Sequence, residues 1–288
     1  MNKLPQITLA FWVMKICATT LGETAGDLLS MTLNVGYAVS SMLLISVFVL
    51  TLLTQLSSKT YNPVLYWLVI LSTSTAGTTL SDFMDRTLGL GYATGSLILV
   101  SILVAIFALW KWSGESLNVN QVQSRRGEMF YWMAILFSNT LGTALGDYLA
   151  DDSGLGFAGG ALFIGATIGV VVLARYFSKI SPVVLFWVAF VLTRPFGATL
   201  GDFLTKPLDK GGLDFGTIGS SLVLAGILVA MIGGATYLKN KQAGQSASGP
   251  GRGRPRPAQT RRRAAASTSS AASSRPDERC RPTSAAAS

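Results

Sequence analysis

The chain has 288 residues, of which half are apolar and 13% are charged, whereas soluble domains carry about 25% charged residues. This composition excludes an ordinary soluble domain and predicts an integral membrane protein. The formal net charge of +9 falls entirely in residues 239–288, which hold 11 basic and 2 acidic residues, so it does not indicate a nucleic-acid partner.

Eight apolar segments follow one another along residues 1–238, each long enough to cross a bilayer core about 30 Å thick. They lie at about 7–29, 36–56, 63–84, 91–112, 129–150, 155–177, 181–205 and 215–238. Their uniform apolarity argues against a β-barrel, whose strands alternate in polarity. The first segment lies where a signal peptide would, but its three charged residues predict a mature helix. We therefore expect an all-α integral membrane protein with eight transmembrane helices.

The eight segments are four copies of one two-helix repeat. In each copy an aspartate follows a Gly-x-x-x-Gly or Gly-x-x-x-Ser motif, and a tryptophan lies fifteen residues before it. The aspartates are Asp27, Asp82, Asp147 and Asp202, and the tryptophans are Trp12, Trp67, Trp132 and Trp187. A glycine begins each second helix, at Gly36, Gly91, Gly156 and Gly216. The aspartates lie 55, 65 and 55 residues apart, so the second half repeats the first with an offset of 120.

Because each repeat crosses twice, all four copies share one orientation and are parallel rather than inverted repeats. We place them at about 8–56, 63–112, 129–177 and 181–238. The segments that join the repeats are mainly basic, whereas the turns within repeats are mainly acidic, with Arg86, Lys206 and Lys210 as their basic residues. By the positive-inside rule, both termini are expected in the cytoplasm.

Residues 239–288 are rich in Ala, Ser, Arg and Pro and show no apolar periodicity. Such a segment cannot bury enough surface to offset its ordering entropy, so we expect a disordered cytoplasmic tail. Two interpretations fit its composition: attachment to anionic lipids through its basic residues, or a solvated tail with no specific role.

Pairs of small residues, four apart, precede the aspartates and predict close helix packing. In a bilayer such pairs let two helix backbones approach, because lipid gives no advantage to burying larger apolar groups. Four pairs in register predict a tight seam beside each acid. The glycines concerned are Gly22, Gly26, Gly77, Gly142, Gly146, Gly197 and Gly201, and Ser81 completes the second pair.

The four aspartates are the main candidates for function. Fifteen residues of helix rise about 22 Å, so if the tryptophans mark the cytoplasmic interface, the aspartates lie in the outer part of the membrane. One interpretation is that they only cap the following turn or helix. The other is that they line an ion or proton pathway, because intramembrane carboxylates are costly and face water or the protein interior.

Hydroxyl side chains cluster on the helical face of the aspartates, three, four and seven residues before them. These positions hold Thr20, Thr24, Thr75, Thr78, Thr79, Thr140, Thr143 and Thr199, together with Glu23. Eleven residues before the aspartates, the same face is apolar, at Ile16, Leu71, Leu136 and Val191. We interpret this face as half of an ion path that ends in an apolar plug, although hydrogen bonding to the helix backbone also explains single threonines.

Three charged residues break the fourfold pattern. Lys15 lies deep in the first helix, Arg194 lies beside Pro195 in the seventh, and Glu23 adds an acid to the first copy. A buried charge needs a partner, so one interpretation is structural ion pairing, such as Arg194 with an aspartate. The other is that Lys15 or Arg194 is a tethered countercation that competes with a transported ion or proton.

The chain has no histidine and two cysteines, Cys17 and Cys280. It therefore lacks the commonest general base and transition-metal ligand, and it has no disulfide framework. No phosphate loop, nucleophile constellation or cofactor motif is present. We expect no enzyme activity and no cofactor.

These four tandem repeats, with their tryptophans and Gly-x-x-x-small-Asp motifs over about residues 8–238, resemble bacterial integral membrane proteins built from the repeat called domain of unknown function 347. The resemblance implies the repeat topology and a bacterial inner-membrane setting. It implies no activity, and the basic tail lies outside it.

The sequence leads to two hypotheses. In the first, the protein is a transporter or channel for a small cation, and carboxylate and hydroxyl oxygens suit protons or hard ions such as alkali ions, Mg²⁺, Ca²⁺ or Mn²⁺. In the second, it is a membrane scaffold or accessory subunit whose motifs only pack helices. The lipid bilayer is its expected surrounding in both, and neither fixes an oligomeric state.

Overall fold

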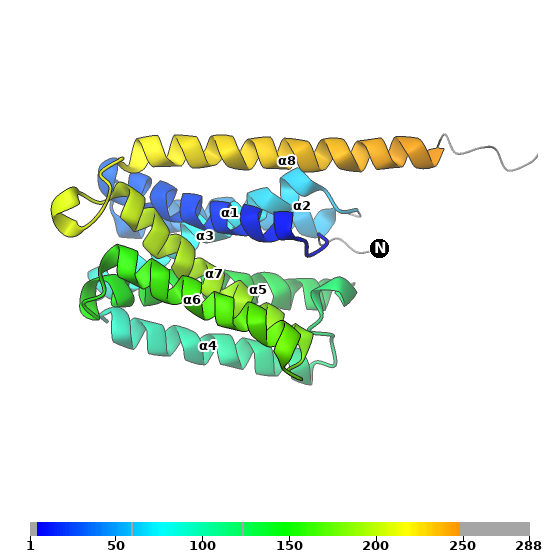
Figure 1. Cartoon of the computed structure of the whole chain (residues 1–288), viewed down its shortest axis with the longest axis horizontal. Coiled ribbons are helices and arrows are strands. Elements are labelled where there is room, and N and C mark those ends of the chain that lie inside the picture. Colours follow the sequence, from blue (N-terminus) through cyan, green and yellow to red (C-terminus); the bar gives the residue numbers. More distant parts are fainter. Residues whose placement is uncertain (1–4, 59, 123, 248–288) are drawn as a thin grey trace, which may run out of the picture. The chain divides into compact units, whose positions relative to one another are not determined.

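The structure, a computed structural model, describes residues 5–58, 60–122 and 124–247. In these ranges every regular element is a helix, and eight of the helices are long (Figure 1). They are α1 Leu9–Asp27, α2 Tyr37–Ser57, α3 Pro63–Asp82, α4 Tyr92–Trp112, α5 Arg125–Asp147, α6 Gly156–Phe177, α7 Pro182–Thr205 and α8 Thr217–Ala247. The predicted all-α fold is confirmed for this part of the chain.

Six helices are long and apolar enough to cross a membrane, namely α2, α3 extended to Thr87, α4, α6, α7, and α8 as far as Leu238. The chain is therefore a multi-pass membrane protein. The helices α1 and α5 are outside this set because they are less apolar: Lys15 and Glu23 lower the mean hydropathy of α1, and uncharged polar residues such as Ser138 and Asn139 lower that of α5. Eight crossings, and cytoplasmic termini, remain predictions.

The predicted tail begins inside a helix. Where the sequence predicts disorder from residue 239, α8 continues to Ala247. The remainder of the predicted tail lies outside the described residues.

Each of the first three aspartates is followed by a short π-helix, namely η1 Leu28–Thr32, η2 Phe83–Thr87 and η4 Tyr148–Asp152. The chain then turns at a glycine with positive φ, 84° at Gly36, 72° at Gly91 and 67° at Gly156. Residues with a Cβ atom rarely adopt this conformation. The repeated glycine is therefore explained by the turn that starts each second helix. In the fourth repeat a longer loop, with the 3₁₀-helix η5 Leu208–Lys210, precedes Gly216 at φ 69°.

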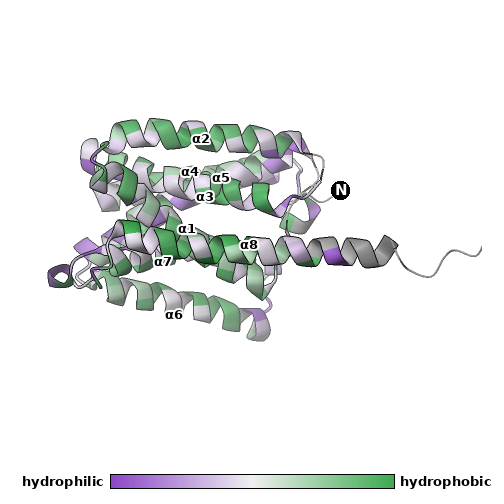
Figure 2. Cartoon of the chain, turned by 90° about the horizontal axis from the view of Figure 1, so that it is seen from above, coloured by the Kyte–Doolittle hydropathy of each residue, from purple (hydrophilic) through white to green (hydrophobic). Residues whose placement is uncertain are grey.

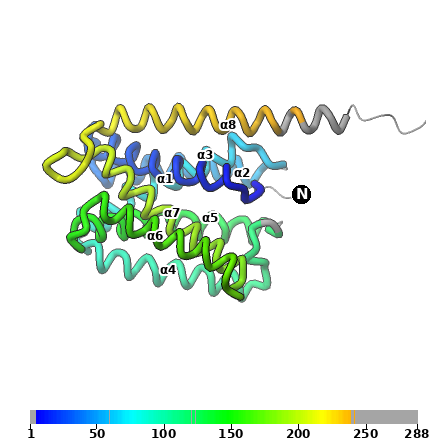
Figure 3. Tube along the Cα trace, in the orientation of Figure 1, coloured from blue at the N-terminus to red at the C-terminus, as the bar shows by residue number. Residues whose placement is uncertain are grey.

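The first helices of the four repeats form a closed inner bundle. In this ring α1 packs against α3, α3 against α5, α5 against α7, and α7 back against α1. The turns that join the two helices of each repeat all lie at one end of the bundle (Figure 3). The repeats are therefore parallel, arranged around an axis that runs along the helices.

The second helix of each repeat packs on the first helix of the next repeat. This holds for α2 on α3, α4 on α5 and α6 on α7. The ring closes through α8, where Ser221 Oγ donates to Thr24 Oγ1 of α1 at 2.8 Å and Cys17 Sγ donates to the Leu224 carbonyl at 3.4 Å. The outer helices α2 and α6 are mostly hydrophobic along their length, as Figure 2 shows. The outer helices are thus suited to face lipid while the inner helices carry the polar residues.

Aromatic side chains from the four inner helices pack against one another in a circle at the tryptophan end of the bundle, and we call this set the aromatic ring. The ring centroids are 5.7 Å apart for Phe11 and Trp67, 5.6 Å for Tyr66 and Trp132, 6.0 Å for Tyr131 and Trp187, and 5.7 Å for Phe186 and Trp12. Three of the four tryptophans are buried. The repeated tryptophan is therefore a core residue between neighbouring repeats, and not the interfacial anchor that its position in the sequence suggests.

Candidate functional site

The inner helices contribute buried side chains in layers four residues apart, because residues one helical turn apart share a face. Counting from the aspartates toward the aromatic ring, each layer takes one residue from each of α1, α3, α5 and α7. The aspartate layer is Asp27, Asp82, Asp147 and Asp202; the Glu23 layer is Glu23, Thr78, Thr143 and Ala198; the Arg194 layer is Thr19, Ser74, Asn139 and Arg194; and the Lys15 layer is Lys15, Ile70, Ile135 and Phe190. Every one of these residues is at most 4% exposed.

Two basic residues divide the aspartate layer into two pairs. Arg86 Nε lies 3.1 Å from Asp82 Oδ1, and its Nη2 lies 3.2 Å from Asp147 Oδ2. Lys206 Nζ lies 2.9 Å from Asp27 Oδ2 and 3.1 Å from Asp202 Oδ1. The aspartates Asp27, Asp82 and Asp147 make no side-chain cap hydrogen bond to the helix that follows. The capping interpretation therefore does not describe them.

The sequence predicts Arg86 and Lys206 to be loop charges in the outer turns, and this prediction is wrong because both contact the buried aspartates. Each lies four residues after its repeat's aspartate, and the two correspond through the 120-residue offset. Burial alone would lower the pKa of Lys206, but the carboxylates of Asp202 and Asp27 raise it above its usual range. Lys206 is therefore positively charged at neutral pH.

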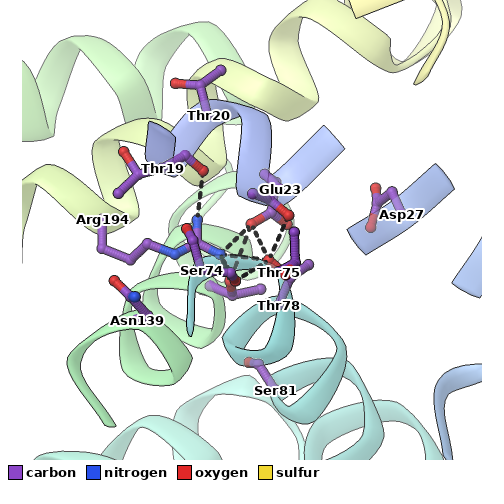
Figure 4. A network of polar contacts seen from close by, with 12 residues as sticks. Thr19, Thr20, Glu23, Asp27, Ser74, Thr75, Thr78, Ser81, Asn139 and Arg194 are labelled. Atoms are coloured by element: carbon purple, nitrogen blue, oxygen red, sulfur yellow. Dashed lines mark hydrogen bonds and ion pairs between the residues drawn. The ribbon is translucent and has the colours of Figure 1, made fainter. Parts of the chain in front are cut away.

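A buried ion pair joins Glu23, one helical turn before Asp27, to Arg194 (Figure 4). Arg194 Nη2 is 2.9 Å from Glu23 Oε2, and both side chains are almost completely buried. Thr78 and Thr143 each donate their hydroxyl to Glu23 Oε2 at 3.1 Å. The structural partner of Arg194 is thus Glu23, where the sequence analysis had suggested an aspartate.

Arg194 is also held by oxygens from three other inner helices. Its guanidinium donates to Thr143 Oγ1 at 2.8 Å, to Thr78 Oγ1, and to the backbone carbonyls of Thr19 at 3.3 Å and Ser74 at 3.4 Å. Hydrogen bonds of this kind offset the large cost of burying a charge. Arg194 therefore crosses the bundle and ties all four inner helices together.

The Glu23 layer and the aspartate layer form one acidic cluster. Glu23, Asp147 and Asp202 each offer a carboxylate oxygen, and these oxygens lie within 4.8 Å of one another. Asp82 and Asp27 join this group through the shared bases Arg86 and Lys206. The structure thus brings the four predicted aspartates and Glu23 together. Their oxygens are the ligand type that hard cations prefer.

Lys15 is completely buried in its layer, with Nζ 4.0 Å from the centre of the Phe190 ring. Among the described residues it has no hydrogen-bond partner. Its interaction in this part of the chain is the cation–π contact with Phe190, and such contacts contribute about 2 kcal/mol when desolvated. Lys15 is therefore outside the acidic cluster, separated from it by the Arg194 layer.

Most of the predicted threonine stripe does not reach the acidic cluster. Only Thr78 and Thr143 among the eight threonines contact Glu23. Own-helix carbonyls accept the hydroxyls of Thr20, Thr75, Thr79, Thr140 and Thr199, and Thr24 bonds to α1 and α8. The predicted plug of Ile16, Leu71, Leu136 and Val191 is only half-buried. Interior positions recur every four residues from the aspartates. The apolar side chains that lie inside the bundle are therefore one residue before the predicted plug, at Ile70, Ile135 and Phe190.

The predicted small residues lie at the seams between inner helices. A Cβ atom added to Gly77 would lie 2.9 Å from the backbone nitrogen of Thr140, one added to Gly26 2.9 Å from Thr78 Cβ, and one added to Gly201 2.9 Å from Glu23 Cβ. Likewise, Cβ atoms at Gly22, Gly142, Gly197 and Gly146 would meet Ser74, Arg194, Thr19 and Ala198. Because the helices approach closely at these glycines, the four residues of each layer can lie near one another in the bundle.

Sequence reasoning missed the basic partners and the Arg194 layer. Thr19, Ser74 and Asn139 lie eight residues before their aspartates, a position that the predicted stripe omitted. The repeat itself carried the signal, because aligned positions four, eight and twelve residues before the aspartates are polar or charged in at least one copy. The same alignment pairs Arg86 with Lys206.

The comparison with protein families found one model, described as a Repeat of Unknown Function (DUF347), which matches residues 10–61, 65–116, 130–181 and 185–240. These four matches cover most of the chain and confirm the resemblance drawn from the repeated motifs. The comparisons with curated proteins and with solved structures found no match.

Proposed function

The chain belongs to the family of proteins built from the DUF347 repeat, and we propose that it carries a small cation, a proton or a hard metal ion, across the membrane along the axis of its inner bundle. The observation behind this proposal is the acidic cluster. Its residues were predicted from intramembrane position and helical phase, and the structure gathers them from all four repeats.

Charge balance in the cluster favours a cation as the cargo. Five carboxylates, those of Glu23, Asp27, Asp82, Asp147 and Asp202, share three basic partners, Arg86, Arg194 and Lys206. Each carboxylate contacts a base, but Arg86 and Lys206 are each shared by two aspartates, so with all groups ionised the cluster carries an excess of two negative charges. Uncompensated buried charge is costly, and one divalent ion or two protons would neutralise the excess. Glu23, Asp147 and Asp202 are the residues that would hold such an ion.

The ion pair of Glu23 and Arg194 would act as the gate of this path. It lies across the bundle between the four aspartates and the Lys15 layer. A cation that binds Glu23 competes with Arg194 for the same carboxylate, so occupancy of the cluster would weaken the gate. Arg194 is then the tethered countercation, and Lys15 a second positive charge beyond it.

Cation flux in proteoliposomes tests the proposal. The wild-type protein is expected to carry H⁺ or one of Na⁺, K⁺, Mg²⁺, Ca²⁺ and Mn²⁺, and the variants Glu23→Gln and Asp202→Asn to lose at least tenfold of that flux. The matched control is Asp209→Asn, because Asp209 is an exposed carboxylate in the loop before α8. Wild-type flux in both cluster variants would exclude the acidic cluster as a pathway.

The scaffold hypothesis is the second candidate, and the seam glycines favour it. The inner helices approach so closely at Gly22, Gly142 and Gly197 that an added Cβ would overlap the neighbouring helix. A scaffold requires this packing but no neutralisable acids. If the wild-type protein carries none of the tested cations, and Asp→Asn variants keep their fold and partner binding, the scaffold is the better account.

A further inference from the structure

A groove of about 570 Å³ lies between α1, α6 and α7 at the tryptophan end of the bundle. Its walls include Trp12 and Ile16 of α1, Ile168 and Val172 of α6, and Phe186 of α7. The volume falls in the range of about 300–1,000 Å³ that is usual for ligand pockets. The groove is separate from the acidic cluster, none of whose residues line it.

The length of the groove matches one leaflet of a bilayer. On α7 its walls extend from Pro182 to Thr193. These twelve residues span eleven helical rises, or about 16 Å, and half of the hydrocarbon core is about 15 Å. An extended acyl chain that enters at the tryptophan end would therefore reach the level of Thr193, near the middle of the membrane.

Charge at the groove is confined to the tryptophan end of the bundle. Among the described residues, Arg175 in the last turn of α6 is the one charged residue of the lining, which also includes the polar residues Asn118 and Tyr176. The rest of the lining is apolar except for Thr193. A ligand with a long apolar part and a negative head therefore complements both regions of the groove.

The corresponding positions in the first two repeats are filled by the protein itself. The 55- and 65-residue repeat spacings align Arg175 with Gln55 and Trp110, and both of these side chains are completely buried. Trp110 packs against Trp187 with ring centroids 5.5 Å apart. In the third repeat an exposed, charged side chain that lines the groove, Arg175, thus stands where the first two repeats hold a buried one.

We propose that this groove binds one acyl chain of an anionic glycerophospholipid from the leaflet at the tryptophan end, with the phosphate on Arg175. Guanidinium groups bind phosphate oxygens through paired hydrogen bonds. The basic C-terminal tail is a poor occupant, because its charge has the same sign as Arg175. The proposal is independent of the transport proposal, since it concerns different residues and a different ligand.

Native mass spectrometry of the delipidated full-length protein tests this site. Phosphatidylglycerol is expected to bind with one-to-one stoichiometry and about fivefold more tightly than phosphatidylcholine with the same chains. Arg175→Gln is expected to remove this preference, and Val172→Trp, which places bulk in the groove from the half-exposed wall of α6, to weaken both lipids. Both positions face outward on α6, so the fold should tolerate the changes.

Arg126→Gln is the matched control, because Arg126 is an exposed arginine that does not line the groove. It should leave the preference for phosphatidylglycerol unchanged. Equal binding of the two lipids by the wild-type protein, unchanged binding in Arg175→Gln and Val172→Trp, or the same loss in Arg126→Gln would each overturn the site. The wild-type protein could instead be a dimer that Val172→Trp dissociates without any change in lipid binding. That result would show that a second copy covers the groove and would also overturn the lipid site.

Discussion

Glu23 occupies in α1 the position that threonine holds in α3 and α5 and that alanine holds in α7. This difference between aligned repeats puts a carboxylate at the centre of the bundle, where Thr78, Thr143 and Arg194 converge on one of its oxygens. The repeat provides the framework, and single departures from it provide the charges. Glu23 and Arg194 are therefore the residues whose roles are most informative to separate.

Glu23→Gln should strongly destabilise the protein because it leaves the buried Arg194 without its carboxylate. Breaking a buried ion pair typically costs about 3–5 kcal/mol. The double variant Glu23→Gln/Arg194→Gln should regain at least half of that loss, because neither charge is then buried alone. Unfolding of the purified protein in mixed detergent micelles measures both effects. Equal stability of the Glu23→Gln variant and the wild-type protein would contradict the pairing.

Lys206 should contribute a stability that does not change over the neutral pH range. Its folded-state pKa is raised above the unfolded value, so its contribution is fully present below the unfolded pKa of about 10.4 and is lost only as pH rises through the folded value. The difference in unfolding free energy between the wild-type protein and Lys206→Gln should thus be constant from about pH 6 to 9. A difference that shrinks steadily across this range would show that the pairs with Asp27 and Asp202 are absent.

At this scale the sequence predicts which residues are unusual but not their partners. Asp27, Asp82, Asp147, Asp202, Glu23, Lys15 and Arg194 were found from polarity in apolar segments, and all are buried. Arg86 and Lys206 follow the aspartates in the chain, so the sequence predicts them to be loop residues. Composition does not show that the chain keeps turning after each aspartate and so places the base four residues later against it. All eight threonines of the stripe are buried, but only Thr78 and Thr143 hydrogen-bond to Glu23, because the contacts depend on how the helices cross.

At the scale of elements, the seam glycines decide whether the inner helices can approach. Gly77→Leu should reduce stability by about 1–3 kcal/mol or more, because the new side chain meets the backbone of α5 at Asn139 and Thr140. Gly169→Leu in α6 is the matched control, since a Cβ atom there meets nothing within 4 Å. Thermal unfolding in one detergent compares the two variants. Similar losses in both would mean that the effect belongs to glycine replacement in general.

The helices themselves were largely predictable, because long apolar segments and the repeated glycine mark their limits. Their pairing was not. Each outer helix packs on the first helix of the next repeat, and nothing in a single repeat distinguishes this from packing on its own partner. The contact of α8 with α1 is the consequence that closes the ring.

At the scale of the whole molecule, the predicted orientation places the segments between repeats in the cytoplasm and the turns within repeats outside. In a Cys280→Ser background, Lys111→Cys and Asp209→Cys should react with a membrane-impermeant thiol reagent from opposite sides of the membrane, because both positions are exposed at opposite ends of the bundle. Lys111→Cys is expected to be labelled only in inside-out vesicles, and Asp209→Cys only in right-side-out vesicles. Labelling of both positions from one side would contradict the parallel two-helix repeats.

The most direct test of the proposed pathway removes the whole aspartate layer at once. The quadruple variant Asp27→Asn/Asp82→Asn/Asp147→Asn/Asp202→Asn is reconstituted at the same density as the wild-type protein, and cation flux is measured in both. Because asparagine keeps the size of each side chain but removes its charge, the account predicts that the wild-type protein conducts and the variant does not. Undiminished flux through a correctly folded quadruple variant would contradict it.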